Sequence, residues 1–233
     1  MEHPLLKNFQ TLSHTLPFRY PYATFLSVFA VDPTTKEMAL QHPQTHKRTL
    51  FIMQCLYGMY LRISELAASA RWTPKMSDFY RDQDNNWWFR TVGKGNKNRQ
   101  IAVSDSVLTA LKRWRIYLNL SPLPSPSDKL PLLSKIKGTG PITHTNYIRS
   151  IIQNCFDKAI AQLKLDDYDE EAEALMEATV HWLRHTGISE DVKTRPREHV
   201  RDDAGHSSGA ITDKYIDIEL KERHASAKSK SLE

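Results

Sequence analysis

TVHWLRHTG, residues 179–187, is the stretch from which the rest of the chain is interpreted. His181 and Arg184 are three residues apart in it, and on a helix this spacing brings both side chains to one face. GHSS at residues 205–208 then supplies His206, and Tyr215 follows nine residues later. Arginine matches phosphate oxygens with a planar fork, imidazole transfers protons near neutral pH, and a tyrosyl oxygen can act as a nucleophile. The order of these residues indicates a site built around a phosphate.

Two segments upstream carry further charged candidates. RISEL, residues 62–66, is predicted to begin a helix with Ser64 as its cap, which places Arg62 and Glu65 side by side. Taken alone, that pair is a surface ion pair worth less than about 1 kcal/mol. GKGNKN, residues 93–98, predicts a hairpin turn with Lys94 at its tip. It lacks the spacing of a P-loop, and taken alone it is a basic loop.

Around these segments the sequence predicts helices and one short sheet. Apolar residues at a spacing of three to four predict helices over residues 45–60, 104–118, 146–165 and 180–192. A short helix over 197–204 is expected to end at Gly205, and a last helix is expected over 219–229. Three strands are predicted over residues 76–82, 87–92 and 99–103, and the proline-rich stretch 121–141 is predicted to be a loop.

Length and composition fit one large globular domain, or one domain and part of a second, with a hydrophobic core. The chain has 233 residues, of which 40% are hydrophobic and 25% charged. No apolar run approaches the ~20 residues of a membrane span, and the first residues lack the order of a signal peptide. Cys55 and Cys155 have no metal-type spacing and are interpreted as buried thiols in a reducing compartment. We therefore expect a cytoplasmic protein with no membrane partner.

The net charge of +5 is unevenly distributed along the chain. Residues 166–177 hold seven acidic residues and no lysine or arginine, so the remainder of the chain is more basic than the total indicates. A basic body with one acidic patch fits a nucleic-acid partner. Ordinary surface charge explains the same distribution equally well.

Taken together, the segments resemble the tyrosine recombinase (phage integrase) family. The matching stretches are GMYLRISEL at 58–66, VGKGNKNR at 92–99, HWLRHTG at 181–187, GHSS at 205–208 and Tyr215. The match covers roughly residues 45–220, and its strength lies in the ordered set. The resemblance implies a mainly α catalytic domain with a small three-stranded antiparallel β-sheet, which agrees with three predicted strands flanked by helices.

The resemblance also implies a reaction. Members of the family cut one DNA strand at a time, form a 3′-phosphotyrosine link and free a 5′-hydroxyl, with no metal, ATP or other cofactor. Tyr215 resembles the nucleophile. Arg62 and Arg184 resemble the pair that clamps the non-bridging phosphate oxygens, where charge develops in the transition state.

Four further residues receive roles from the same resemblance. Lys94 resembles the general acid that protonates the leaving 5′-oxygen, and His181 the proton acceptor for the tyrosine. His206 resembles a hydrogen-bond donor to the phosphate, and Glu65 a residue that orients an arginine or a histidine. For His185 we expect packing or hydrogen bonding, because the residue after His181 is not the glutamate that a zinc protease helix needs.

The chain departs from the family pattern in several places. Residues 193–203 are unusually polar, with Asp202 and Asp203 where small apolar residues are common. Residues 166–178 look like an insertion without a functional role. Only 61 residues precede Arg62. We therefore interpret residues 1–44 as an N-terminal segment and the tail of a missing core-binding domain, residues 45–220 as the catalytic domain, and residues 221–233 as a C-terminal helix or tail.

The expected function is that of a site-specific recombinase or integrase of a mobile element acting on double-stranded DNA. A catalytic domain alone should bind DNA weakly. We expect a monomer in solution and a tetramer on DNA, with the C-terminal helix docked in trans on a neighbouring protomer. One alternative is an enzyme like the type IB topoisomerases, which usually have a lysine at the position of His181. The other is a DNA-binding module without cleavage activity, which leaves the intact Tyr215 unexplained.

Overall fold

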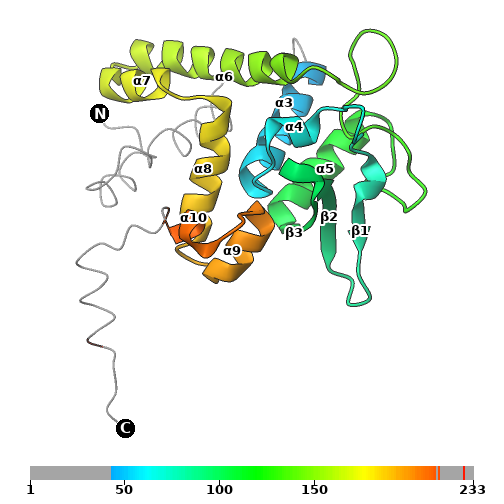
Figure 1. Ribbon diagram of the computed structural model, residues 1–233. Coiled ribbons are helices and arrows are strands. Elements are labelled where there is room, and N and C mark those ends of the chain that lie inside the picture. Colours follow the sequence, from blue (N-terminus) through cyan, green and yellow to red (C-terminus); the bar gives the residue numbers. More distant parts are fainter. Residues whose placement is uncertain (1–42, 214, 216–227, 229–233) are drawn as a thin grey trace.

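The computed structural model describes residues 43–213, 215 and 228 (Figure 1). Helices make up most of this part, and one small sheet lies at its edge (Figure 1). The predicted N-terminal segment and the helix predicted over 219–229 fall almost entirely outside the described residues. The predicted fold class, mainly α with a three-stranded antiparallel sheet, is confirmed.

The sheet is an antiparallel meander in the order β1-β2-β3. Its strands are β1 (Phe79–Arg81), β2 (Trp87–Val92) and β3 (Asn98–Ala102). Phe89 on the central strand lies opposite Phe79 on one side and Ile101 on the other, and all three side chains are buried. The sheet therefore turns one apolar face to the core, as alternation along strands requires.

The first predicted strand was too long. Residues Met76–Asp78 form a 3-10 turn, η2, and only Phe79–Arg81 pair with β2. The Asp78 carboxylate accepts a hydrogen bond of 2.6 Å from the backbone N–H of Lys75. This local side-chain contact closes a turn that competes with the extended backbone that the apolar pattern predicts.

Helix α3 (Pro43–Gly58) is the central helix of the described chain (Figure 1). It packs against α5 (Asp105–Tyr117) and α8 (Val180–Asp191). Ser104 caps α5 as predicted, because its hydroxyl accepts a hydrogen bond from the N–H of Val107. The α3 side chains Phe51, Ile52, Cys55 and Leu56 are fully or almost fully buried.

The acidic segment forms part of the packed structure. It contains α7 (Asp169–Met176), which lies along α6 (Thr145–Leu165) in Figure 1 and contacts it. Ala172 and Leu175 of α7 are buried, while its acidic residues are mostly exposed. The segment is thus an amphipathic helix and not a fully solvated one.

Two short helices follow α8. They are α9 (Arg197–Ala204), which has the predicted bounds, and α10 (Gly209–Asp213). A small buried cluster of Tyr60, Ile188, Val200 and Ala204 attaches α9 to α8 and to the end of α3. Tyr215 packs partly buried against this cluster, so the same apolar contacts that hold α9 also position the tyrosine.

Among the described residues there is neither a candidate membrane-spanning helix nor a candidate metal-binding group. No helix in residues 43–213 has both the length and the apolar character that a membrane crossing needs. Within the same part of the chain, histidine, cysteine, aspartate and glutamate side chains form no group of three or more that could hold a metal ion.

Candidate active site

Helix α8 holds Arg184 between two backbone carbonyl groups. Its Nη1 donates to the carbonyl of Tyr60, and its Nη2 donates to the carbonyl of Ala204 at 2.7 Å. The guanidinium is therefore fixed between the chain after α3 and the end of α9. Burial and the neighbouring charges of Arg62 and Arg99 lower the pKa of Arg184 to about 10, so the group stays charged at neutral pH.

Arg62 and Glu65 lie at the start of α4 (Ile63–Leu66), a helix of only four residues. The predicted cap, Ser64, is wrong: Arg62 is the N-cap residue, and the Glu65 carboxylate accepts its backbone N–H at 2.6 Å. Glu65 is 2% exposed, so the interpretation of this pair as a surface ion pair is also wrong. The Arg62 side chain lies 3.4 Å from Glu65 and remains partly exposed. A buried carboxylate thus holds an arginine that faces outward.

Arg99 on β3 is the residue that the sequence reasoning missed. Its Nη2 donates to Glu65 Oε2 at 3.0 Å, and its Nη1 donates to the Ala204 carbonyl at 2.9 Å. Alternation along β3 was the available signal, because it places residue 99 on the same inward face as the buried Ile101. Glu65 was expected to orient an arginine or a histidine, and in the structure it contacts two arginines.

The hairpin turn that carries Lys94 borders this cluster. It is the 3-10 turn η3 (Lys94–Asn96) between β2 and β3, closed by a hydrogen bond from the Gly93 N–H to the Lys97 carbonyl at 2.8 Å. A Cβ placed on Gly93 would lie 3.1 Å from Glu65 Oε1. The base of the turn therefore packs on the buried carboxylate, and the backbone of Lys94 starts beside it.

His206 follows the left-handed residue that ends α9. Gly205 has a φ of 64°, and the His206 N–H donates back to the Arg201 carbonyl at 3.1 Å. The imidazole Nδ1 lies 2.9 Å from the hydroxyl of Thr212, which is fully buried. Burial, reinforced by the positive charges of Arg184, Arg62 and Arg99, lowers the pKa of His206 to about 4. His206 is therefore uncharged at neutral pH.

Tyr215 packs against two imidazole rings. Its ring stacks on those of His185 and His206, with centroids 5.5 and 5.9 Å away. Its hydroxyl lies 2.5 Å from His185 Nδ1. Burial raises the pKa of Tyr215, while the positive charges of Arg184 and Arg62 oppose that rise. His185 thus has the hydrogen-bonding role expected for it.

His181 lies one helical turn before His185 and is exposed. The two rings meet edge to face at 5.3 Å. Partial burial and the positive charges of Arg184, Arg62 and Arg149 lower the pKa of His181. The structure thus places His181 next to His185, and it is His185 that contacts the tyrosyl oxygen.

A polar network beneath the site accounts for Asp203, an acid where an apolar residue was expected. Its carboxylate accepts the backbone N–H of Ala102 on β3 at 3.1 Å and Arg195 Nη2 at 2.5 Å. Arg195 also donates to Asp191 and to the Tyr60 hydroxyl, which itself donates to Asp191. Asp203 therefore ties α9 to the sheet and to α8 through charge-assisted hydrogen bonds.

Replacing Asp203 with alanine should lower the free energy of unfolding by about 2 kcal/mol, because the partly buried Ala102 N–H loses its acceptor and the Arg195 guanidinium loses one of its carboxylate partners. Urea denaturation of wild type and variant measures this change. Asp202→Ala is the matched control, since its side chain is 65% exposed and it should change stability by less than about 0.5 kcal/mol. Equal stability of the two variants would contradict a structural role for Asp203.

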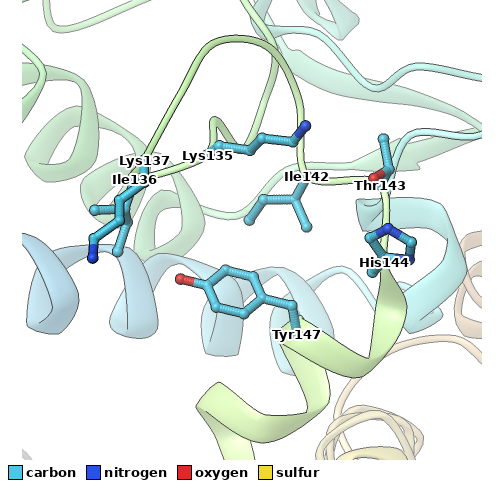
Figure 2. A pocket seen from close by; sticks show the side chains of 7 residues that line it. All are labelled: Lys135, Ile136, Lys137, Ile142, Thr143, His144 and Tyr147. Carbon is cyan, nitrogen blue, oxygen red and sulfur yellow. The ribbon is translucent and has the colours of Figure 1, made fainter.

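A separate cavity of about 370 Å³ opens between the loop after residue 134 and the start of α6 (Figure 2). Figure 2 shows the side chains that line it: Lys135, Ile136, Lys137, Ile142, Thr143, His144 and Tyr147. None of the predicted site residues is among them. The cavity is therefore a feature distinct from the arginine and histidine cluster.

The cluster as a whole is positively charged. It contains the guanidinium groups of Arg62, Arg99 and Arg184 and a single carboxylate, that of Glu65. Such an excess of positive charge at a partly buried place favours binding of an anion. The charges of Arg62 and Arg184 act on Tyr215 and on the uncharged His206, so the arrangement can combine anion binding with a tyrosyl oxygen.

The sequence matches the phage integrase family over residues 33–222, which is most of its length. The chain belongs to this family. Among curated protein sequences, none matches the integrase-family chain. The match to the family over residues 33–222 confirms the resemblance found in the ordered motifs.

Solved structures of recombinases share the fold of this integrase-family chain. One is the XerH site-specific recombinase bound to difH substrate in a pre-cleavage complex, with a TM-score of 0.52 and 17% identity over 93% of this chain and 55% of XerH. Another is the Tn1549 transposon integrase in complex with transposon right end DNA, with a TM-score of 0.53 and 17% identity over 93% of this chain and 66% of that one. At these identities the likeness establishes the fold, and the chain spans only part of each relative.

Proposed function

We propose that the chain carries the catalytic domain of a site-specific DNA recombinase or integrase, and that it cleaves and rejoins DNA through a 3′-phosphotyrosine intermediate. The observation that carries the proposal is the position of Tyr215. Its hydroxyl contacts His185, its ring stacks on His206, and the charges of Arg184 and Arg62 act on it. These contacts support a site in which Tyr215 is the nucleophile, the histidines accept its proton and the arginines bind the phosphate.

In the proposed step the Tyr215 oxygen attacks phosphorus, an O–P bond forms and the bond from phosphorus to the 5′-oxygen breaks. Arg62 and Arg184 bind the non-bridging oxygens, and His206 donates a hydrogen bond to the phosphate. Lys94, on the hairpin turn, protonates the leaving 5′-oxygen. The phosphodiester bond energy is kept in the phosphotyrosine link, so rejoining by a 5′-hydroxyl needs no ATP.

The proton of the tyrosine has two candidate acceptors. The resemblance assigns this role to His181, whereas the hydrogen bond to the tyrosyl oxygen favours His185. Burial and nearby positive charge lower the pKa of both imidazoles, so both are uncharged at neutral pH and can accept a proton. We assign the direct acceptance of the tyrosine proton to His185 Nδ1. His181 is then the group to which His185 passes the proton.

The partners and setting of the reaction are part of the proposal. Double-stranded DNA is the substrate, which is supported by the net charge of +5 and by the DNA in the XerH and Tn1549 structures. We propose action in the cytoplasm on a mobile element, by a monomer that assembles into a tetramer on DNA. Residues 45–220 form the catalytic domain in this proposal, and residues 221–233 supply the helix docked in trans.

A covalent trapping experiment tests the function. The protein is mixed with nicked duplexes drawn from the DNA that flanks its gene, and the products are separated on a denaturing gel. We expect a DNA-linked band that protease removes, with a free 5′-hydroxyl on the released strand that a polynucleotide kinase can label. A labelled strand with no protein link would contradict the proposed chemistry.

The same material separates the alternatives. An enzyme like a type IB topoisomerase would relax supercoiled plasmids of unrelated sequence, which a site-specific recombinase does only at its site. A DNA-binding module would shift the duplex on a native gel and form no covalent band.

A further inference from the structure

We infer that Arg99 is a positioning residue. It fixes the positions of Arg62, Arg184 and the turn that carries His206 relative to one another. The inference rests on the proposed function of the site and assigns a role to a residue that the function itself does not use. Arg99 acts from β3, a strand that also donates a backbone hydrogen bond to Asp203 of α9.

The contacts of Arg99 connect elements that are far apart in the sequence. One arm binds the Glu65 carboxylate, which also holds the backbone and side chain of Arg62. The other arm binds the Ala204 carbonyl, which also accepts a hydrogen bond from Arg184. A continuous path of hydrogen bonds therefore runs from Arg62 through Arg99 to Arg184.

The Ala204 carbonyl is the point where two guanidinium groups meet. Arg99 approaches it at 2.9 Å and Arg184 at 2.7 Å. This carbonyl is the last of α9, one residue before Gly205 and two before His206. Fixing it from two sides fixes the direction in which the chain leaves the helix, and with it the start of the His206 turn.

Arg99 has no room to bind the substrate itself. It is 8% exposed, and a Cβ on Gly205 would lie 2.6 Å from its Nη1. Gly205 also has a positive φ, so a side chain there would be strained as well as crowded. The guanidinium is enclosed by α9 and Glu65, and its effect on a phosphate must pass through the residues that it holds.

The fork of the guanidinium is essential to this role. One planar group reaches a carboxylate and a carbonyl at the same time, whereas a lysine ammonium is a compact point charge on a flexible stem. Arg99→Lys therefore keeps the charge and loses the bridge. Arg99→Met keeps much of the volume and loses both.

Arg115 provides a matched control. It is also a buried arginine that binds a carboxylate and a backbone carbonyl, Asp128 at 2.7 Å and Ser121 at 2.8 Å, and it donates to the Ser121 hydroxyl as well. It lies on α5, and none of the site residues is among its partners. Arg115→Met should cost stability as Arg99→Met does, without an effect on the site.

The test compares the three variants with wild type in urea stability, affinity for the nicked duplex, single-turnover trapping and the pKa of His206 by NMR titration. For Arg99→Met we expect trapping about a hundredfold slower, because a displacement of about 1 Å costs that much, with duplex affinity within about threefold. The His206 pKa should rise, because the Arg99 charge, one of the three arginine charges that lower it, is gone, while those of Arg62 and Arg184 remain.

Arg99→Lys should trap nearly as slowly but keep the His206 pKa near that of wild type, which separates the bridge from the charge. Arg115→Met should trap at the wild-type rate. The inference is overturned if Arg99→Lys traps within twofold of wild type, or if Arg115→Met is slowed as much as the Arg99 variants. If wild type forms no covalent band, the proposed function fails, and an unchanged His206 pKa in Arg99→Met would then overturn the inference separately.

Discussion

Tyr215→Phe is expected to slow strand cleavage at least about a thousandfold, the scale on which removal of a nucleophile acts. The substitution removes the oxygen that contacts His185 and keeps the ring that stacks on His185 and on His206. DNA affinity should therefore stay within about twofold of wild type. Single-turnover trapping on a nicked duplex and a native gel shift measure the two quantities.

Tyr147→Phe is the control for this prediction. The Tyr147 hydroxyl also accepts a hydrogen bond from a side chain, Arg48 Nη2 at 3.0 Å, and Tyr147 lies at the start of α6, where it lines the cavity of Figure 2. This variant should cleave at the wild-type rate. Undiminished cleavage by Tyr215→Phe would remove the nucleophile assignment and the mechanism that depends on it.

Gly187→Ala should lower the free energy of unfolding by about 3 kcal/mol, the upper part of the range for overpacking a core. A Cβ at this position would overlap the Tyr57 carbonyl oxygen and lie 3.0 Å from the carbonyl carbon. Both are backbone atoms of α3, so relief requires the whole of α8 to move away. Because Arg184 reaches the Tyr60 carbonyl across this same contact, cleavage should fall together with stability.

Urea denaturation tests the prediction, with Gly209→Ala as its control. Nothing lies within 4 Å of a Cβ built on Gly209, which begins the short helix α10. Its stability should stay within about 0.5 kcal/mol of wild type or rise slightly. A Gly187→Ala protein as stable as wild type would show that α3 and α8 are not held at this distance.

Local patterns predicted most of the helices, and they failed where a side chain competed with the backbone pattern. The strand over residues 87–92 and the helix over 197–204 have the predicted bounds, because each depends on periodicity and on a clear break. The first strand lost its first half to a turn closed by Asp78. The cap of α4 shifted from Ser64 to Arg62 because the Glu65 carboxylate binds the N–H of residue 62.

The site could be predicted only in part. The ordered motifs identified the family, which is confirmed, and the fold brings the charges of Arg62 and Arg184 to bear on both Tyr215 and His206. Arg99 was not predicted, because its partners lie 34 and 105 residues away and only tertiary packing joins them. The contact of His185 with the tyrosyl oxygen depends on the same packing and is equally invisible in a motif.

The double use of the Ala204 carbonyl has an evolutionary consequence. The acceptor belongs to the main chain, so any small residue that fits the closed space at position 204 can supply it. Adding or deleting one residue in α9 is different, because it rotates the terminal carbonyl by about 100° around the helix axis. Among descendants of this sequence, α9 should therefore keep its length more strictly than its composition.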